Sequence, residues 1–516
     1  MSGDGNGERD RAEAVLPAPE PGGAREIPAP ARPPAADSPV GPRDAAATAG
    51  PARPLPPRLD PWLLAGVFAA VYAALSLSRY RHMETMSWDL GIFEQAVKGY
   101  AHLHAPVADL KGPGFDELGD HFSPVVALIA PFYRVFPSTV TLLVAQALLF
   151  ALSVVPVTRA AGLLLGRGSG LAVGAAYGLS WGIQRAVEFD FHEIAFAVPL
   201  LAFSLAAVLL RRWTAAMLWA LPLVLVKEDL GAAVATIGAV VWLRAGQDTL
   251  RGAAGGGRVR PWALRLAAFG IVASAWEIGW LIPLLHGPGY DAFNHIDGDG
   301  TLTGHIPPVT ALRTLLWVLL PAGGLLALRS PLLLVVLPTL GWRFVSHYPE
   351  NWGTAWHYNA VLMPVVFLAA VDCAALVAAA APGGRRAPQW LRAAARALPA
   401  TALGAAVALG TQLPVAGLTH LAAYRVDGGT RAAERALARI PDGATVEANV
   451  GPISRLVRRT TVYWVGQTGG RTPDFLAFEN LSGWLTDPAG YARQLHPQAR
   501  YATVADAGGY VVLRRE

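Results

Sequence analysis

The stretch TVTLLVAQALLFALSVVPVTRAAGL, residues 139 to 163, decides the class of this protein. A helix needs about 20 mostly apolar residues to cross the hydrocarbon core of a bilayer, and this stretch is long enough. Hydrophobic residues make up 53% of the 516-residue chain and charged residues only 15%, whereas soluble domains carry about 25% charged residues. The sequence therefore predicts an α-helical membrane protein that crosses the bilayer many times.

Further apolar stretches follow along the chain. Counting them predicts about eleven spans, and two short ones share the charged break KED at residues 227 to 229. A run at 122–136 is interrupted by Pro124 and Pro131, so we expect it to dip into the membrane or lie along it. The predicted spans are 62–79, 139–163, 169–186, 193–210, 214–227, 230–244, 266–285, 309–328, 331–347, 357–381 and 399–421.

The positions of the arginines predict which side of the membrane each loop faces, because cytoplasmic loops are enriched in Arg and Lys. With the N-terminal tail inside, the 12 histidines and the acidic clusters all fall on the outer side. We therefore predict a multi-pass protein of the plasma (cytoplasmic) membrane with a cytoplasmic N-terminus and any chemistry on the outer face. The predicted inner arginines are Arg159, Arg167, Arg211, Arg212, Arg244, Arg251, Arg258, Arg260, Arg265, Arg329, Arg385, Arg386, Arg392 and Arg396.

The two ends of the chain differ from the middle in composition. Residues 1–58 are rich in Pro, Ala, Gly and Arg and almost lack large apolar side chains, which predicts a disordered cytoplasmic tail. Short alternating strand and helix patterns over 424–516 predict a small extracytoplasmic α/β domain. The transmembrane domain is then 59–423, with its first outer loop at 80–138.

Composition also excludes several classes of protein. The lone cysteine, Cys373, excludes an intramolecular disulfide and a cysteine-based metal site. The arginines lie between apolar runs and do not form one basic face, so we expect no nucleic-acid partner. No hydrophobic core lies near Met1, and we expect no cleaved signal peptide.

The first outer loop begins with SWDLGIFEQAVKGY, residues 87 to 100, which has the spacing of a short amphipathic helix on the outer membrane surface. Asp89 stands where a helix N-cap would. On one interpretation Asp89 only caps the helix and Glu94 lies on its solvated face. On the other, Asp89 is a general base whose pKa is raised by partial desolvation at the lipid boundary. The apolar stripe is made by Leu90, Phe93, Val97 and Tyr100.

Four further outer segments carry charged and aromatic side chains: GDHFSP at 119–124, FDFHEIAF at 189–196, LVKEDLG at 225–231 and WHYNAVLMP at 356–364. Each has an ordinary explanation as a helix cap, a hairpin tip in water or an interfacial anchor. Each also suits contact with an anionic group, because ionisable residues at membrane depth and helix starts favour a phosphate. The candidate substrate-binding residues are His121, His192, Lys227, Glu228, His357 and Tyr358.

These motifs occur in a characteristic order along the chain. WDLGIFEQ, GDHFSP, FHEIAFAVPLL, KED, HYPENWGTAWHYNAVLMP and IPDGATVEANVGPISRLVRRTTVYWV together resemble the bacterial membrane-protein family called domain of unknown function 2079, over about residues 60 to 516. That family resembles the GT-C superfamily of polytopic glycosyltransferases. The resemblance implies lipid-phosphate-linked sugar donors and an acidic residue in the first outer loop, a place that Asp89 occupies. Residues 121–124 resemble a His-Pro motif that closes this loop, but the usual pair of adjacent acids is replaced by Asp89 with Glu94 five residues later.

We therefore expect a membrane-embedded glycosyltransferase that uses a polyprenyl-phosphate-linked sugar, with Asp89 and Glu94 as candidate catalytic residues. No cofactor is certain, although Asp89, Glu94, Asp120 and His121 could together hold one divalent cation; no metal-binding signature is present. Two other functions stay open. A transporter or lipid-handling protein would place charges inside spans, where Asp372 and Glu277 are the candidates. A non-catalytic scaffold would only present the outer domain.

Overall fold

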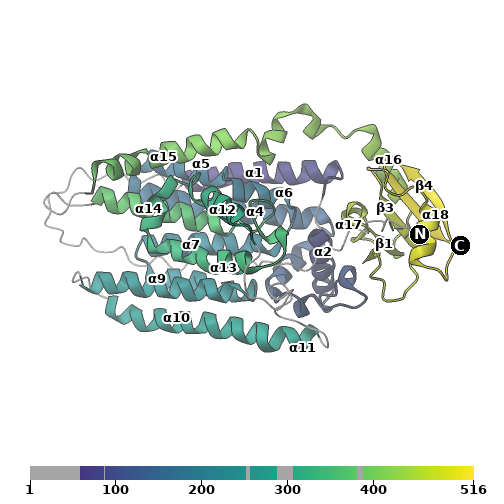
Figure 1. Ribbon diagram of the computed structural model, residues 1–516, viewed down its shortest axis with the longest axis horizontal. Coiled ribbons are helices and arrows are strands. Elements are labelled where there is room, and N and C mark those ends of the chain that lie inside the picture. The colour runs from purple at the N-terminus through teal and green to yellow at the C-terminus, as the bar shows by residue number, and fades with distance from the viewer. Residues whose placement is uncertain (1–58, 86–87, 251–255, 287–305, 380–386) are drawn as a thin grey trace, which may run out of the picture.

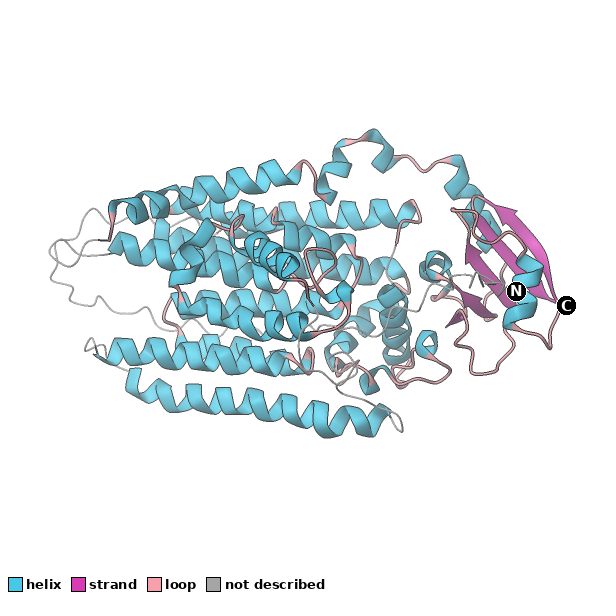
Figure 2. Cartoon of the chain, viewed as in Figure 1, coloured by secondary structure: helices cyan, strands magenta, loops and turns pink. Residues whose placement is uncertain are grey.

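The computed structural model describes residues 59–85, 88–250, 256–286, 306–379 and 387–516. A helical bundle forms most of this part of the chain, and a small domain that contains a β-sheet stands at one end of it (Figure 1). Figure 2 shows the strands gathered in that end domain, while the rest is helix and loop. The predicted disordered tail at 1–58 lies outside the described residues.

Six described helices are long and apolar enough to cross a membrane, and each overlaps a predicted span. In α14, 72% of the most apolar window is buried, against 17% in the α10–α11 unit, so α14 is central and α10–α11 presents its apolar side chains outward to lipid. The protein is a multi-pass membrane protein. The six are α1 (Asp60–Arg81), α4 (Thr139–Leu165), α9 (Leu230–Leu250), the unit made of α10 (Gly256–Trp276), a π-helical turn (Glu277–Leu281) and α11 (Ile282–His286), α14 (Leu362–Ala379) and α15 (Gln389–Gly410).

Other predicted spans are shorter or broken, and proline or glycine marks the breaks. The predicted span at 309–328 stops early because Gly323 and Gly324 have φ angles of 136° and 66°, which helical residues do not adopt. The predicted span at 399–421 is shifted: α15 ends at Gly410, and Pro414 begins a 3-10 turn. The shorter elements are α5 (Arg167–Gly178), α6 (Trp181–Glu188), η4 (Glu193–Phe196), α7 (Ala197–Leu209), α8 (Trp213–Ala220), η5 (Leu221–Leu225), α12 (Pro308–Leu319), η8 (Pro331–Val336) and α13 (Leu337–Val345).

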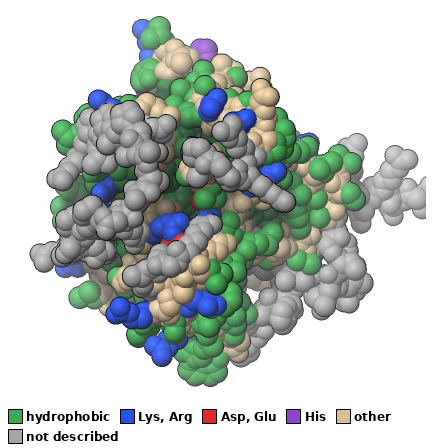
Figure 3. Space-filling view, turned by 90° about the vertical axis from the view of Figure 1, so that its left-hand side faces the viewer, with side chains coloured by type: hydrophobic (Ala, Val, Ile, Leu, Met, Phe, Trp, Pro, Cys, Tyr) green, Lys and Arg blue, Asp and Glu red, His purple; other side chains and the backbone are tan. Residues whose placement is uncertain are grey.

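Four of the arginines predicted for the inner side lie at one end of the bundle. Arg258 and Arg260 are near the start of α10, and Arg392 and Arg396 are near the start of α15. Both starts are at the end of the bundle away from the sheet domain (Figure 1). Figure 3 faces that end and shows Lys and Arg side chains around it, with few acidic ones. The charge asymmetry that underlies the predicted orientation is therefore a feature of the folded bundle.

The C-terminal region forms the small α/β domain that the sequence predicts. Its sheet has the strand order β2-β1-β3-β5-β4; β1 is parallel to β2 and β3, and β5 is antiparallel to β3 and β4. The short strands and helices lie where the alternating pattern predicted them. They are α16 (Gly428–Leu437), β1 (Thr445–Ala448), α17 (Val450–Leu456), β2 (Thr461–Trp464), β3 (Phe475–Glu479), α18 (Pro488–Leu495), β4 (Tyr501–Ala507) and β5 (Tyr510–Arg515).

The helix α2 (Trp88–Ala101) differs from its prediction. Instead of lying on a membrane surface with one polar side in water, it is enclosed between the bundle and the C-terminal domain. Leu90 and Phe93 join the core of the bundle, whereas Trp88 and Ile92 join the core of the domain. At Gly91 a Cβ atom would lie 2.2 Å from Ile453 Cγ2, so the sequence permits α17 to approach this closely only because the residue is glycine.

Two details of the first outer loop are corrected by this packing. Glu94 is fully buried, so the interpretation that placed it on a solvated face is wrong. Since α2 begins at Trp88, Asp89 lies inside the first turn and is not the N-cap. The run at 122–136 forms η3 (Pro124–Ile129) and α3 (Ala130–Val135), each with a proline in its first turn.

Candidate active site

Asp89 faces two histidines that come from distant parts of the chain. Asp89 Oδ2 lies 3.8 Å from His192 Nε2, and the His192 ring stacks on the His357 ring with centroids 3.7 Å apart. The His192 side chain is 1% exposed, whereas that of Asp89 is 25% exposed. The carboxylate of Asp89 is therefore the part of this group that a substrate can reach from solvent.

His192 is fixed from its other side by neighbouring polar groups. Its Nδ1 lies 2.8 Å from Glu193 Oε2, and Glu193 is completely buried. The His192 backbone N–H donates to Gln146 Oε1 at 3.0 Å, and the Gln146 amide donates to the carbonyl of Asp190 at 2.6 Å. The His192 imidazole thus lies between the carboxyl groups of Asp89 and Glu193. Glu193 was not among the predicted site residues; its only signal was the HE pair in FDFHEIAF.

His121 belongs to a second, ionic group beside Asp89. His121 Nδ1 lies 3.0 Å from Glu228 Oε1, and the backbone N–H of Phe122 donates to Glu228 Oε2 at 3.2 Å. Lys111 pairs with Glu117 at 3.0 Å and with Asp120. The ionic group therefore ties the end of the first outer loop to the KED turn between η5 and α9.

The pKa values in the ionic group follow from this pairing. Burial raises the pKa of Glu228, but His121 and Lys227 outweigh that effect and hold it below its ordinary value. The pKa of Asp120 is lowered in the same way, since His121 and Lys111 outweigh burial. Burial raises the pKa of Glu117 to about 7 even though Lys111 opposes the shift. Asp120 and Glu228 are thus fixed anions at neutral pH.

Lys227 acts electrostatically on both of these groups and has unused hydrogen-bonding capacity. The residue is 3% exposed, and its Nζ has no hydrogen-bond partner among the described residues. The nearest carboxylate in an ion pair is Glu228, at 4.0 Å, and the Trp342 ring centroid is 5.9 Å away. Its charge also lowers the pKa of Asp89. A buried ammonium with three donors to satisfy is a strong attractor for an anionic oxygen.

The protein around Asp89 changes the pKa of its carboxyl group. Desolvation raises the pKa of Asp89 from 3.8 to about 6, although Lys111, His121 and Lys227 each lower it. A carboxyl with a pKa near 6 is ionised at neutral pH and is a stronger base than an ordinary aspartate. Asp89 is therefore suited to accept a proton from a hydroxyl group.

Tyr358 and the loop that contains His357 are held by an arginine that was not among the predicted site residues. Arg343, at the end of α13, is fully buried and donates to the carbonyls of Asn351 and Gly353 at 2.8 and 3.0 Å. Its guanidinium also donates to the Asn359 side chain at 3.0 Å and lies 5.5 Å from the centre of the Tyr358 ring. The available signal was an arginine inside the predicted span 331–347, where a charge is costly unless it has a role.

Glu94 lies on a different side of α2 from Asp89. Residues five apart on a helix are separated by roughly 140° around its axis. Glu94 accepts hydrogen bonds from the Tyr133 and Thr139 hydroxyls at 2.9 and 2.6 Å. The hydroxyl of Thr139 also lies 2.9 Å from the carbonyl of Ser454 in α17. Glu94 therefore joins α2 to α3, α4 and the C-terminal domain, away from the reactive carboxylate.

The four residues that we expected around a divalent cation are not gathered at one point. Glu94 is held by Tyr133 and Thr139, and the Lys111 ammonium lies against Asp120. In the described ranges, no group of three or more His, Cys, Asp or Glu side chains is arranged to hold a metal ion. The nearest cation to Asp120 in this arrangement is the lysine.

Comparison with known proteins gives the family. A family described as "Predicted membrane protein (DUF2079)" matches residues 79–512, which is most of the chain. The chain belongs to this family. No curated protein matches this DUF2079 member.

Among solved structures, two crystal structures of ArnT from Cupriavidus metallidurans are similar to this DUF2079 protein. The one bound to undecaprenyl phosphate has a TM-score of 0.52 and 15% identity, and the likeness covers 88% of this chain and 97% of that chain. The apo structure has a TM-score of 0.45, with the same identity and coverage. The first likeness shows the fold: this DUF2079 protein shares the fold of ArnT, and its described residues form a helical bundle and a small C-terminal sheet domain.

Proposed function

We propose that this protein transfers a sugar from a polyprenyl-phosphate donor to an acceptor hydroxyl at the outer face of the membrane. The observation that carries the proposal is Lys227, a buried ammonium without a hydrogen-bond partner in the described part of the chain, next to Asp89. ArnT, which shares the fold, was crystallised with undecaprenyl phosphate, and this supports a lipid phosphate as the anion that Lys227 receives.

The reaction needs a base for the acceptor hydroxyl and a cation for the leaving phosphate, and the site offers both. The acceptor oxygen attacks the anomeric carbon of the sugar and loses its proton to Asp89. The bond from that carbon to the phosphate oxygen breaks, and its electron pair leaves with the polyprenyl phosphate. The phosphate gains a negative charge in this step, so a preorganised cation lowers the barrier. Lys227 supplies that cation, and His121 and His357 supply further N–H donors.

His192 and Glu193 assist Asp89 in this proposal. The 3.8 Å separation of Asp89 Oδ2 and His192 Nε2 lets the imidazole take up the proton after transfer. Glu193, at 2.8 Å from the other ring nitrogen, is assigned the role of holding the imidazole in position. We assign Glu94 to the support of α2, since its carboxylate is occupied by the Tyr133 and Thr139 hydroxyls.

The proposed orientation puts the N-terminus in the cytoplasm and the C-terminal domain outside. The arginine-rich starts of α10 and α15 lie at the end of the bundle away from that domain (Figure 1), which supports this orientation under the positive-inside rule.

The two groups that a transporter would use give that function less support. Asp372 in α14 is neutralised by Arg244 and accepts a hydrogen bond from the Ser330 hydroxyl at 2.5 Å. Such a pair lacks the free charge that a transport pathway requires. Glu277 lies in the π-helical turn of the outermost helical unit and is 3% exposed. A scaffold without activity does not explain why the ammonium of Lys227 is buried without a hydrogen-bond partner among the described residues.

The test is binding of undecaprenyl phosphate to the purified protein. We expect Lys227→Met to weaken binding at least tenfold, since a hydrogen-bonded ion pair to phosphate contributes about 1.5–3 kcal/mol. Asp89→Asn should bind as the wild type does but lose transfer. The matched control is Lys98→Met, because Lys98 is a half-buried lysine whose ammonium donates to Val457 and Thr460 carbonyls. Equal affinity of wild type and Lys227→Met would refute the phosphate site.

A further inference from the structure

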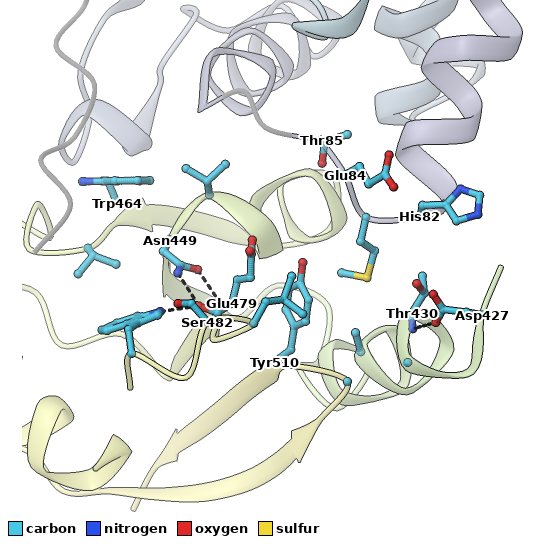
Figure 4. Close-up of a pocket in the computed structure, with 18 of the residues that line it drawn as sticks. His82, Glu84, Thr85, Asp427, Thr430, Asn449, Trp464, Glu479, Ser482 and Tyr510 are labelled. Carbon is cyan, nitrogen blue, oxygen red and sulfur yellow. Dashed lines mark hydrogen bonds between the residues drawn. The ribbon is translucent and has the colours of Figure 1, made fainter. Parts of the chain in front are cut away.

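A large cavity that the proposed reaction does not use lies between the C-terminal domain and the chain that joins α1 to α2 (Figure 4). Its volume is about 950 Å³, within the range of pockets that enclose small ligands. The joining chain contributes residues 82–85, and the domain contributes residues from α16, the ends of β1, β2 and β3, and the start of β5. Asp89, His121, His192, Lys227 and His357 are not among the lining residues.

Aromatic rings line one side of this cavity. Trp484 is 40% exposed and meets Tyr491 edge-on, with ring centroids 5.4 Å apart. The Trp484 indole N–H donates to the carbonyl of Glu479 at 2.9 Å, so the ring is held in one orientation. The negative face of an indole attracts the weakly positive C–H groups on the flat side of a sugar ring. A fixed and exposed tryptophan therefore suits stacking against a sugar.

Two polar groups inside the cavity have no hydrogen-bond partner among the described residues. Tyr510 is 2% exposed, and its hydroxyl lacks a hydrogen-bond partner within the described residues. In Figure 4 this hydroxyl and the carboxylate of Glu479 both point into the space between the domain and the joining chain. A Cβ atom on Gly451 would lie 2.1 Å from Glu479 Oε2 and 2.8 Å from the Tyr510 hydroxyl oxygen, so both groups converge on this glycine.

Glu479 is positioned by its backbone, which leaves its carboxylate available. The Glu479 N–H donates to Asn449 Oδ1 at 2.8 Å, and the Asn449 amide donates back to the Glu479 carbonyl at 3.0 Å. No hydrogen bond or ion pair of the Glu479 carboxylate is found over the described ranges, and burial raises its pKa. A carboxylate accepts hydrogen bonds from two neighbouring hydroxyls at once. The site can thus recognise the adjacent hydroxyl groups of a sugar.

The charges of the lining select against anionic ligands. Three carboxylates, those of Glu84, Asp427 and Glu479, belong to the lining, against one imidazole from His82; the Glu84 carboxylate also pairs with Arg79 at 3.7 Å, which leaves Asp427 and Glu479 as the main negative charges. A phosphate or a uronic acid would be repelled by this lining, because like charges at short range are unfavourable. The ligand that fits is a polyhydroxylated molecule without negative charge.

One lining residue of the cavity contacts the helix that carries Asp89. Trp464, which lines the cavity, packs against Trp88 with ring centroids 5.6 Å apart, and Trp88 directly precedes Asp89 in α2. The Thr85 hydroxyl and the Ser454 hydroxyl are 2.7 Å apart, so the joining chain is tied to α17. The lining of the cavity is therefore packed against the helix that carries Asp89.

We propose that this cavity binds the uncharged sugar residues of a glycan, which, if the proposed function holds, is the acceptor. The aromatic face of Trp484, the carboxylate of Glu479 and the hydroxyl of Tyr510 recognise the sugar. Lys227 and its neighbours recognise the donor separately. The C-terminal domain is then the part of the protein that selects what is glycosylated.

The test is titration of the full chain in nanodiscs with four neutral trisaccharides: maltotriose, cellotriose, mannotriose and chitotriose. Trigalacturonate is the anionic comparison, and binding is followed by saturation-transfer NMR and calorimetry. We expect saturable millimolar or tighter binding of at least one neutral trisaccharide and none of trigalacturonate. Trp484→Ala and Glu479→Gln should each weaken that binding about tenfold. Trp390→Ala, which removes a 62% exposed tryptophan on α15, should leave it unchanged.

Two results would overturn the proposal: no saturable binding of any neutral trisaccharide, or binding that Trp484→Ala and Glu479→Gln both leave intact. Lys227→Met separates this proposal from the proposed function. Glycan binding that survives Lys227→Met, while undecaprenyl phosphate binding is lost, supports both sites. Glycan binding by a protein that never binds undecaprenyl phosphate supports the cavity and removes the assignment of the glycan as an acceptor.

Discussion

Substitution of Glu94 by glutamine should change how the stability of the protein depends on pH. Burial raises the pKa of Glu94 from 4.5 to about 7, although the Thr139 and Tyr133 hydroxyls lower it. Each pKa unit corresponds to about 1.4 kcal/mol, so ionised Glu94 costs the folded state about 3 kcal/mol relative to the unfolded chain. The side chain is completely buried, and solvent does not reduce this figure.

The sign follows from proton binding. Because the pKa is higher in the folded state, the folded protein binds more protons than the unfolded chain between pH 4.5 and about 7. The stabilising contribution of protonated Glu94 is therefore complete below pH 4.5 and is lost as the pH rises through about 7. Glutamine stays neutral throughout, so Glu94→Gln should gain about 3 kcal/mol relative to the wild type between pH 4.5 and pH 8.

The hydrogen bonds explain why a neutral side chain fits at this position. The Thr139 hydroxyl has one proton but two acceptors within reach, Glu94 Oε2 at 2.6 Å and the Ser454 carbonyl at 2.9 Å. When Glu94 carries a proton it can donate to Thr139, and Thr139 can then donate to Ser454. The amide of a glutamine can do the same, so Glu94→Gln keeps the link between α2, α4 and α17.

The assay is denaturant or thermal unfolding in detergent, followed by tryptophan fluorescence, at several pH values from 5 to 8. The quantity compared is the difference between variant and wild type, because other groups that titrate, such as Glu117, are present in both proteins. Glu350→Gln is the control, since Glu350 is exposed, and it should show no pH-dependent difference. A difference between Glu94→Gln and wild type that stays constant over this pH range would refute the reasoning.

Three further predictions concern the candidate active site. The rate of sugar transfer should fall about tenfold from pH 8 to pH 5 as Asp89, with a pKa of about 6, takes up a proton. Because Lys227 lowers the pKa of Asp89, Lys227→Met should move this decrease in rate to higher pH. An unchanged pH profile would contradict the assignment of Asp89 as the base. Arg343→Met should destabilise the fold by about 3 kcal/mol or more and expose residues 346–361 to protease, because two backbone carbonyls lose a charged hydrogen-bond donor. Unchanged unfolding and unchanged cleavage would argue against a role of Arg343 in holding this loop. Binding of undecaprenyl phosphate should survive EDTA, because Lys111 already pairs with Asp120; loss of binding that Mg²⁺ restores would instead support a bound cation.

Much of the architecture was predictable because it depends on local sequence. The span at 139–163 needs only its own length and apolar composition to identify it, and α4 covers it from Thr139 to Leu165. The C-terminal strands were likewise marked by short apolar runs between turns, such as TTVYWV before β2. The predicted span at 309–328 was wrong because Gly323 and Gly324 have positive φ angles, which other residues rarely adopt and which interrupt a helix.

The candidate site was only partly predictable. Asp89, His121, His192, Lys227 and His357 were each marked by charge on the predicted outer side, and the fold brings them together from five separate segments. Their distances could not be read from the chain, because each depends on how helices far apart in sequence pack. Arg343 was missed since its role, holding the loop at 346–361, exists only once that loop has folded over it.

By itself the sequence determined that this is a multi-pass membrane protein with a small α/β domain after the last span, because apolar length and strand periodicity are properties of contiguous residues. Only the tertiary structure decided that α2 is enclosed on both sides, that Glu94 serves packing instead of facing solvent, and that Lys227 is buried without a hydrogen-bond partner in the described part of the chain. Burial is set by the elements that pack around a residue, and for α2 these include residues 367 positions away, such as Val462, whose carbonyl accepts a hydrogen bond from Gln95. That long-range packing is what turns scattered polar residues into a site.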